Sequence, residues 1–270
     1  MNRIEQIFAD LRTRGGRALM PFLTAGDPDL ETTAALLPAL QAAGACICEL
    51  GVPFSDPLAD GPVIQASMAH ALGSGLRPAQ ILEMTARERP HLDLGLVLMV
   101  SYTIVHRLGE AAFCRQAHQG GIDGLIVPDL TIEAADTLRQ RAADEGIVCS
   151  FLIAPTTPLE RAERIVRAST GFVYVLARAG ITGERSHLPE SLPARIRRLR
   201  DLTGLPIAVG FGISDPAQVR AVVQYADAAI VGSAIMRRIA EHRGEERSKL
   251  VERVKDFTKD LAGGLTNCSA

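Results

Sequence analysis

The stretch IDGLIVPDLTIEAADTLRQRAADEGIVCSFLI, residues 122–153, contains the succession of patterns on which the fold depends. Its two ends, 122–128 and 147–153, are continuously apolar, which is typical of parallel strands buried on both faces. The segment between them, 131–146, has the apolar spacing of a helix and ends in Gly146, a residue type common where helices stop. The stretch therefore predicts a strand–helix–strand unit of a parallel sheet.

The same unit repeats along the whole chain. Six further apolar runs have the same character: 18–23, 45–50, 94–100, 171–176, 206–211 and 227–232. Amphipathic segments lie between them, two of which end at Gly44 and Gly120, and most runs begin 21 to 35 residues after the previous one. Eight strands, each followed by a helix, predict an α/β fold, a (β/α)8 TIM barrel. An open doubly wound sheet is the alternative, but it usually has fewer strands and a glycine-rich first turn, which this chain lacks.

The length of the chain fits a single barrel domain with extra helices. A chain of 270 residues is within the range of one barrel, and no linker or change in composition divides it. The long interval of about 49 residues after the start of the run 45–50 leaves room for additional helical segments. We therefore expect a barrel domain over residues 1–262 and a flexible C-terminal tail over residues 263–270.

The composition favours a cytoplasmic protein with a large core. Hydrophobic residues make up 47% of the chain and the net charge is −2, so broad binding to nucleic acid or to an anionic membrane is not expected. Ile4, Ile7, Phe8 and Leu11 predict an amphipathic first helix rather than a signal peptide, and no apolar run reaches membrane-spanning length. The five cysteines form no CxxC pair, and we interpret them as reduced thiols.

Acidic residues after the second strand are the first candidates for catalysis, because barrel enzymes work at the C-terminal ends of their strands. Glu49 closes the run 45–50, and Asp56 and Asp60 follow in a proline-rich loop. A carboxyl group at the end of a buried strand needs a polar pocket or a raised pKa, which suits acid–base work near neutral pH. A salt-bridged structural glutamate is the alternative. Asp56 precedes Pro57 and is explained more simply by an Asx turn.

Glycines gather after the last three strands and indicate a phosphate site. Backbone N–H groups can approach a phosphate closely at glycine, and barrels often bind phosphate at these loops against a helix N-terminus. Any one of these glycines could instead serve only a tight turn. The candidate residues are Gly183, Gly210, Gly212, Gly232 and Ser233.

Metal and imine chemistry are not expected from this sequence. The six histidines show no HxxxH pair and no cluster with cysteine near the acids. The three lysines, Lys249, Lys255 and Lys259, all lie in the C-terminal helical segment, so none is available at a strand end for a Schiff base. We therefore expect no cofactor, and any carbon–carbon cleavage would proceed by proton transfer.

Several motifs of the chain resemble those of the tryptophan synthase α chain family. They are PFLTAGDP (21–28), ELGVPFSDPLADGPVIQ (49–65), RAGITG (178–183), GFGIS (210–214) and GSAI (232–235). The resemblance extends from about residue 3 to residue 260, with the motifs in the order and at the spacings of the family. PFSDPLADGP is highly specific, whereas GFGIS alone would be weak.

The resemblance implies a carbon–carbon lyase of L-tryptophan biosynthesis that cleaves indole-3-glycerol phosphate to indole and glyceraldehyde 3-phosphate. It places the catalytic acids at Glu49 and Asp60 and an active-site tyrosine at Tyr174. It assigns the phosphate contacts to the glycines and the serine named above. Phe22 and Phe211 would line the indole pocket.

The resemblance also implies a partner, and two residues depart from the family pattern at the expected contact surface. In the family, a β chain that carries pyridoxal phosphate consumes the indole within an αββα heterotetramer. Thr103 stands where the family usually has asparagine, and Thr131 stands where it has proline. We expect the complex with a β chain. A stand-alone lyase that releases free indole, or a non-catalytic partner that activates a β chain, are the alternatives.

Overall fold

Nine parallel strands form one continuous sheet in a computed structural model that describes residues 1–57, 60–178, 188–210 and 212–265. Their order across the sheet is β5-β4-β3-β2-β1-β9-β8-β7-β6. The strands are β1 (Ala18–Thr24), β2 (Ile47–Gly51), β3 (Gly95–Met99), β4 (Gly124–Ile126), β5 (Val148–Cys149), β6 (Leu152–Ile153), β7 (Val173–Leu176), β8 (Ile207–Gly210) and β9 (Ala228–Val231).

The predicted (β/α)8 barrel is confirmed, with one of its eight strands interrupted. β5 and β6 are two pieces of the single run predicted at 147–153, because this segment changes neighbours midway. β5 pairs with β4, and Ser150 N donates to the Leu125 carbonyl (3.0 Å). β6 pairs with β7, and Tyr174 N donates to the Phe151 carbonyl (3.2 Å). The two edges of the sheet are thus joined by one short piece of chain, which closes the ring.

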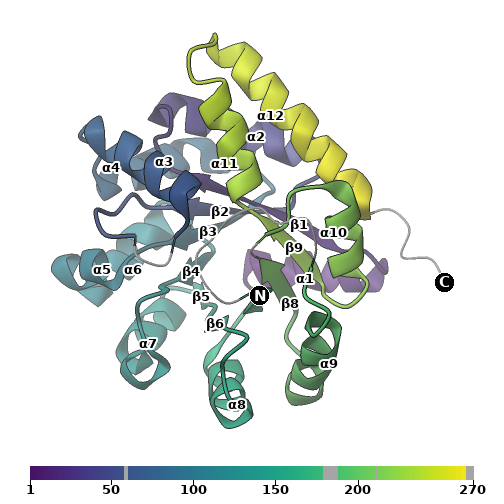
Figure 1. The fold of residues 1–270 in the computed structure, drawn as a ribbon. Coiled ribbons are helices and arrows are strands. Elements are labelled where there is room, and N and C mark those ends of the chain that lie inside the picture. Colours follow the sequence, from purple (N-terminus) through teal and green to yellow (C-terminus); the bar gives the residue numbers. More distant parts are fainter. Residues whose placement is uncertain (58–59, 179–187, 211, 266–270) are drawn as a thin grey trace.

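Helices surround the ring of strands (Figure 1). They cover the outer face of the sheet, and the long interval after β2 contains two of them, α3 and α4, as the spacing predicted. The α-helices are α1 (Arg3–Thr13), α2 (Leu30–Ala42), α3 (Pro62–Gly73), α4 (Pro78–Glu88), α5 (Tyr102–Leu108), α6 (Glu110–Gln119), α7 (Asp136–Asp144), α8 (Leu159–Ala168), α9 (Leu192–Leu202), α10 (Pro216–Val223), α11 (Ser233–Glu241) and α12 (Arg247–Ala262). Short 3-10 turns are η1 (Arg89–His91), η2 (Ile132–Ala134) and η3 (Gly263–Leu265).

Alternation along each strand separates two apolar layers. Successive side chains of a strand point to opposite faces, so one set enters the barrel and the other meets the helices. On β2, Ile47 belongs to the cluster inside the barrel, while Cys48 and Leu50 belong to the layer between sheet and helices. Glu49 therefore points into the barrel, on the same side as Ile47.

The expected end of a helix at Gly120 is confirmed, and the first residues after the expected domain boundary form a short turn. Gly120 ends α6 with an ordinary φ of −72°, and the left-handed residue is the next one, Gly121, at φ +73°. Residues 263–265, which were expected to begin a flexible tail, form η3, and Gly264 is buried where an added methyl group would stand 2.9 Å from Val219. Residues 266–270 lie outside the described residues.

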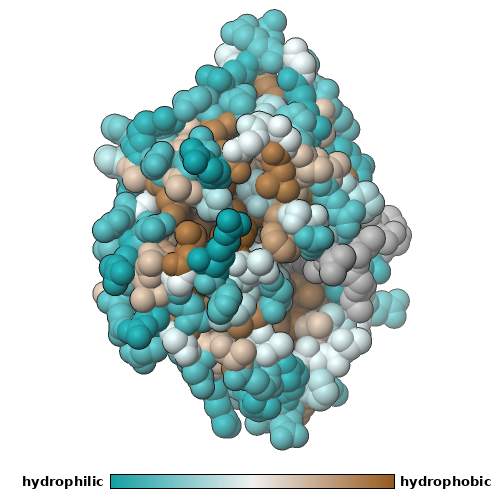
Figure 2. Space-filling model, turned by 90° about the vertical axis from the view of Figure 1, so that its left-hand side faces the viewer, coloured by the Kyte–Doolittle hydropathy of each residue, from teal (hydrophilic) through white to brown (hydrophobic). Residues whose placement is uncertain are grey.

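The side of the molecule that carries α4 to α6 is mainly hydrophilic, with apolar side chains scattered between polar ones (Figure 2). Among the described residues the large apolar side chains that are clearly exposed are Met1, Leu108, Leu159 and Tyr225. No helix in the described ranges is both long enough and apolar enough to cross a membrane.

Helix α1 closes the barrel at the N-terminal ends of the strands. Ile4 and Phe8 are buried against the cluster inside the barrel, and the ring of Phe8 lies 6.0 Å from that of Phe172. Asn2 caps the helix and also donates from Nδ2 to the carbonyls of Asp123 (2.8 Å) and Gly146 (2.7 Å). The predicted amphipathic helix is confirmed and serves as the floor of the barrel.

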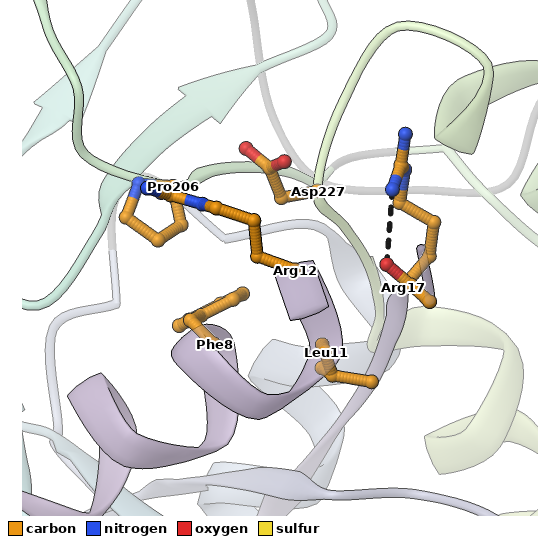
Figure 3. Close-up of a pocket in the computed structure, with 7 residues that line it drawn as sticks. Phe8, Leu11, Arg12, Arg17, Pro206 and Asp227 are labelled. Atoms are coloured by element: carbon orange, nitrogen blue, oxygen red, sulfur yellow. Dashed lines mark hydrogen bonds between the residues drawn. The ribbon is translucent and has the colours of Figure 1, made fainter. Parts of the chain in front are cut away.

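Beside the end of this helix lies a pocket of only about 50 Å³, between α1 and the start of β8 and β9 (Figure 3). Arg12 and Arg17 line it, but both arginines already donate to backbone carbonyls, Arg12 to Gly204 (3.1 Å) and Arg17 to Val223 (3.1 Å). The pocket has room for very few water molecules and lies at the end of the barrel opposite to the candidate acids.

Candidate active site

Glu49 is the most unusual group among the described residues. It lies near the C-terminal end of β2, in register with Phe22 on β1 and Val97 on β3, and its side chain is fully buried. Neither carboxyl oxygen has a hydrogen-bond partner within the described ranges. Burial raises the pKa of Glu49 from 4.5 to about 8. No salt bridge to a described residue holds Glu49, and the group is a buried acid inside the barrel.

Asp60 lies in the loop that leads from β2 to α3. Two hydrogen bonds hold the backbone of Asp60: Gln65 on α3 donates from Nε2 to its carbonyl (2.8 Å), and Asp60 N donates to the Pro57 carbonyl (3.1 Å). The side chain is half-buried, and burial raises its pKa from 3.8 to about 6. Asp56 is exposed and accepts a hydrogen bond from Ser55 Oγ (2.6 Å), as expected for a turn residue.

Tyr174 is the third candidate catalytic residue within the described ranges. Its side chain is buried on the inner face of β7, and the pKa of its phenol is raised by burial first and then by the negative charges of Glu49 and Asp60. Both carboxyl groups therefore lie within electrostatic reach of this hydroxyl, which stays protonated at neutral pH. The structure brings the three candidate catalytic side chains together from β2, the loop after β2, and β7.

Two glycines make room for the aromatic residues of the site. A methyl group at Gly210 on β8 would stand 2.5 Å from the hydroxyl oxygen of Tyr174, so the phenol fits only against glycine. A methyl group at Gly51 would stand 2.5 Å from the ring of Phe22. Gly210 was predicted as a phosphate contact and has at least this packing role as well. The role of Gly51 could be found only once the register of β1 and β2 was known.

The predicted phosphate residues are partly within the described ranges. Gly232 precedes α11 and Ser233 is its first residue, so their backbone N–H groups belong to the free N-terminus of that helix. A methyl group at Gly232 would make only ordinary contact, at 3.4 Å, so packing alone does not require glycine there. Gly212 has φ +88°, which favours glycine. Gly183 and Phe211 lie outside the described residues.

Sequence reasoning missed a set of contacts that connects the loop after β1 to α3 and α11. Thr24 Oγ1 lies 2.6 Å from Ser67 Oγ on α3, and Thr24 N donates to the sulfur of Met236 on α11 (3.3 Å). The buried carboxylate of Asp27 accepts two hydrogen bonds from Arg243 (2.8 and 2.7 Å). Asp27 is present in the motif TAGDP, but a partner 216 residues away leaves no signal in one sequence.

Thr103 and Thr131 lie on the exposed surface at the C-terminal ends of β3 and β4. Thr103 is in the first turn of α5, where its N–H donates to Ser101 Oγ (3.2 Å). Ser101 in turn donates to Asp129 (2.7 Å), which ties the two loops together. Thr131 caps η2 with φ −75°, close to the value that proline would impose.

Among the described residues, no group near the acids is arranged to hold a metal ion, and no lysine lies there to form an imine. Within the described ranges no group of three or more His, Cys, Asp and Glu side chains is arranged to hold a metal ion. All three lysines lie in α12, on the outer side of the barrel.

The fold defines the class of protein, a (β/α)8-barrel enzyme, and two carboxyl groups of raised pKa lie at the C-terminal ends of its strands. The family model for the tryptophan synthase alpha chain matches residues 8–265. The chain belongs to the tryptophan synthase alpha chain family.

Relatives and solved structures agree with this assignment over nearly the whole chain. A tryptophan synthase alpha chain from Acaryochloris marina is 48% identical over 266 residues, which is 98% of each chain. One from Rhodopirellula baltica is 43% identical and covers 96% of this chain and 95% of its own. A structure of Mycobacterium tuberculosis tryptophan synthase superimposes with a TM-score of 0.89 at 33% identity and covers 98% of both chains. A tryptophan synthase alpha chain structure from Legionella pneumophila also gives 0.89, at 30% identity, covering 100% of this chain and 99% of its own.

Proposed function

We propose that this chain cleaves indole-3-glycerol phosphate to indole and glyceraldehyde 3-phosphate, and that Glu49, Asp60 and Tyr174 carry out the cleavage. Membership of the family supports the reaction. The observation that carries the assignment of roles is the pair of carboxyl groups whose surroundings separate their pKa values, Glu49 at about 8 and Asp60 at about 6. Two carboxyl groups with different pKa values can divide acid and base work between them at one pH.

At pH 7 the two groups are in different states. Glu49, with a pKa of about 8, is mostly protonated and can give a proton, whereas Asp60, with a pKa of about 6, is mostly ionised and can only accept hydrogen bonds. The orphaned carboxyl of Glu49 has no competing partner among the described residues, so its proton is available to a substrate.

The reaction follows from these two states. Glu49 protonates carbon 3 of the indole ring, which leaves a cationic ring whose N–H becomes more acidic. Asp60 accepts a hydrogen bond from that N–H and stabilises the developing positive charge. The bond between the ring and the glycerol carbon then breaks: its electron pair returns to the ring, the glycerol carbon becomes an aldehyde, and the ionised Glu49 takes up the hydroxyl proton. The acid is restored, and no electrons enter or leave.

Other residues position the substrate in this proposal. Tyr174 keeps its proton and offers a hydrogen-bond donor inside the barrel. Phe22 and Phe211 line the indole pocket. The phosphate is held by backbone N–H groups at Gly183, Gly210, Gly212, Gly232 and Ser233, where the N-terminus of α11 adds a favourable dipole.

We further propose that the chain works with a tryptophan synthase β chain. The similar structure from Mycobacterium tuberculosis is that of a tryptophan synthase, and the carboxylate-loop motif is complete in this sequence. Thr103 and Thr131 favour the alternative of a stand-alone lyase, because both change the exposed surface where the family contacts its partner. We place the reaction in the cytoplasm, in agreement with the free thiols of Cys46, Cys48, Cys114 and Cys149.

One assay tests both proposals. The purified chain is mixed with indole-3-glycerol phosphate, with and without a tryptophan synthase β chain, and indole is measured. Indole formation that is strongly stimulated by the β chain, together with co-elution of the two chains, is the expected result. Full activity alone without co-elution would defeat the complex, and no indole under either condition would defeat the reaction.

A further inference from the structure

A second pocket lies outside the barrel, between α8 and α9 and beyond the end of β6. Its volume is about 370 Å³, which falls in the range of small-molecule sites. Ile153, Leu159 and Leu199 contribute apolar wall, and Arg195 and Arg198 contribute two positive charges. α8 and α9 lie next to each other on the outside of the ring in Figure 1.

Arg195 occupies a position on α9 that normally holds an apolar residue. Leu192, Ile196 and Leu199 form the buried stripe of this helix, and Arg195 lies three residues after the first of them. The side chain is half-buried: one guanidinium nitrogen, Nη2, donates to the Leu176 carbonyl, while Nε is buried without a hydrogen-bond partner. Burial lowers the pKa of Arg195, and no described carboxylate forms an ion pair with it.

Two other partly buried arginines, Arg89 and Arg243, each have a carboxylate partner. Arg89 lies 3.1 Å from Asp123, and Arg243 lies 2.7 Å from Asp27. Neither Arg195 nor Arg198 has such an ion pair with a described residue. Partly buried cations are rarely left uncompensated, because removing a charge from water costs free energy unless it is paired. The difference points to a negative group supplied from outside the chain.

We propose that the pocket between α8 and α9 binds a small organic anion, a carboxylate or phosphate group joined to an apolar body about the size of one aromatic ring. The guanidinium groups of Arg195 and Arg198 would bind the anionic head by charge-assisted hydrogen bonds. The apolar body would lie against Ile153, Leu159 and Leu199. This site is separate from the barrel interior, and the proposal does not depend on the reaction proposed above.

The position of Arg195 also connects the pocket to the active site. Its hydrogen-bond acceptor, Leu176, follows Tyr174 on β7 by two residues and is in register with Gly210 on β8. An anion that draws the guanidinium toward the pocket therefore acts on the strand ends that hold Tyr174 in place.

Binding can be tested on the intact chain with 4-phenylbutyrate and phenyl phosphate as probes, and with neutral 4-phenylbutanamide as the matched control. The readout is the methyl NMR spectrum of alanine-labelled protein, because Ala162 and Ala194 line the pocket. We expect at least one anion to shift both signals in a saturable way, and the amide to bind about tenfold more weakly or less. The tighter of the two anions identifies the head group. Equal affinity for acid and amide, shifts confined to alanines inside the barrel, or no saturation at millimolar concentrations would each overturn the proposal.

Variants of the pocket arginines provide an independent test of anion binding. The double variant Arg195→Gln, Arg198→Gln should lose about tenfold or more in affinity for the anion. Arg197→Gln removes the same charge from an exposed neighbour on α9 that does not line the pocket, and should bind like the parent chain. Unchanged affinity in the double variant would refute the site, and the acid–amide comparison on the parent chain decides the matter if that variant does not fold.

Discussion

Partly buried acids at the N-terminal ends of the strands accept hydrogen bonds from the fold. Glu49, near the C-terminal ends, accepts none from a described residue. Asp123, just before β4, accepts from Leu96 N (2.8 Å) and from Arg89 (3.1 Å). Asp227, just before β9, accepts in the same way from Ile207 N (2.8 Å) and pairs with Arg200 (2.6 Å). Each of these aspartates connects its own strand to the neighbouring one.

Glu49 has the opposite surroundings, since both of its oxygens are buried without a partner among the described residues. An unsatisfied buried polar group costs on the order of 1–3 kcal/mol. The fold therefore tolerates an unsatisfied buried carboxyl group at Glu49, whereas Asp123 and Asp227 have hydrogen-bond donors. The comparison indicates that Asp123 and Asp227, at the N-terminal ends of the strands, hold strands together. Glu49, near the C-terminal ends, is left available to a ligand.

The largest effect is expected from Glu49→Gln. The amide has the same shape but cannot donate a proton to the ring, so kcat for indole formation should fall about 10²- to 10⁴-fold, while the circular dichroism spectrum stays unchanged. Turnover close to that of the parent chain would show that this acid is not the proton donor and would remove the main difference between the two ends.

Asp60→Asn should give the next largest effect. The charge of Asp60 matters most when the ring is cationic, so the variant should lose about 10²- to 10³-fold in kcat with a much smaller change in KM. Steady-state kinetics with indole-3-glycerol phosphate measures this split. A change confined to KM would instead assign Asp60 to ground-state binding.

The pH dependence of stability should distinguish Glu49 from every paired acid. Because its pKa is about 8 in the folded chain and about 4.5 when unfolded, the folded chain keeps a proton that the unfolded chain releases between these values. The stability that this proton confers is complete below about pH 4.5 and is lost as pH rises to 8. Relative to the parent chain, Glu49→Gln should therefore gain unfolding free energy between pH 5 and pH 8. Because one pKa unit corresponds to about 1.4 kcal/mol, this gain is on the order of 4 kcal/mol. Urea unfolding across this range measures the difference, and a constant difference would contradict the raised pKa.

Asp123→Ala tests the N-terminal end of the barrel. Removal of the carboxylate leaves Leu96 N and Arg89 without their acceptor, so unfolding free energy should fall by about 3 kcal/mol. Activity per folded molecule should remain near that of the parent chain. Asp144→Ala on exposed α7 is a suitable control and should change stability by less than about 0.5 kcal/mol. A loss of kcat at full folding would mean that the two ends are not separate in function.

The smallest effect is expected from Thr131→Pro at the upper surface. Thr131 already has φ −75°, which proline adopts without strain, so the substitution should stabilise the chain by about 0.4–1 kcal/mol through the unfolded state. Thr131→Ala should be neutral in the same urea titration. A destabilised proline variant would show that the N–H of Thr131 is needed. If the variant also binds a β chain more tightly, the departure at this position weakens the complex.

The sequence predicted the eight strands, the barrel and the first helix because burial on both faces leaves continuous apolar runs. It could not predict that the run 147–153 divides into β5 and β6, because apolar character reports burial and not which neighbour a residue pairs with. Glu49 was found from its place after an apolar run. Its lack of hydrogen-bond partners could not be predicted, because it depends on every residue that faces Glu49 inside the barrel.

Other parts of the site depend on contacts distant in sequence. Gly51 is glycine because Phe22 from the neighbouring strand fills the space beside it, and Asp27 finds Arg243 from the other end of the chain. Arg195 was not singled out from the sequence, because its place on the apolar stripe of α9 borders a pocket only through the packing of α8 beside it.

Helix α1 also has a consequence for the order in which the chain acquires its structure. It leaves the ribosome before the segments that it packs against, because its contacts come from much later residues: Asn2 reaches Gly146, and Phe8 reaches Phe172. During synthesis its apolar face has no barrel to cover until well over half of the chain has emerged. The helix that closes the barrel is therefore synthesised before its partners and docks late, and contacts of such long sequence separation slow folding. Until then, an early apolar helix remains open to chaperones and to premature contacts.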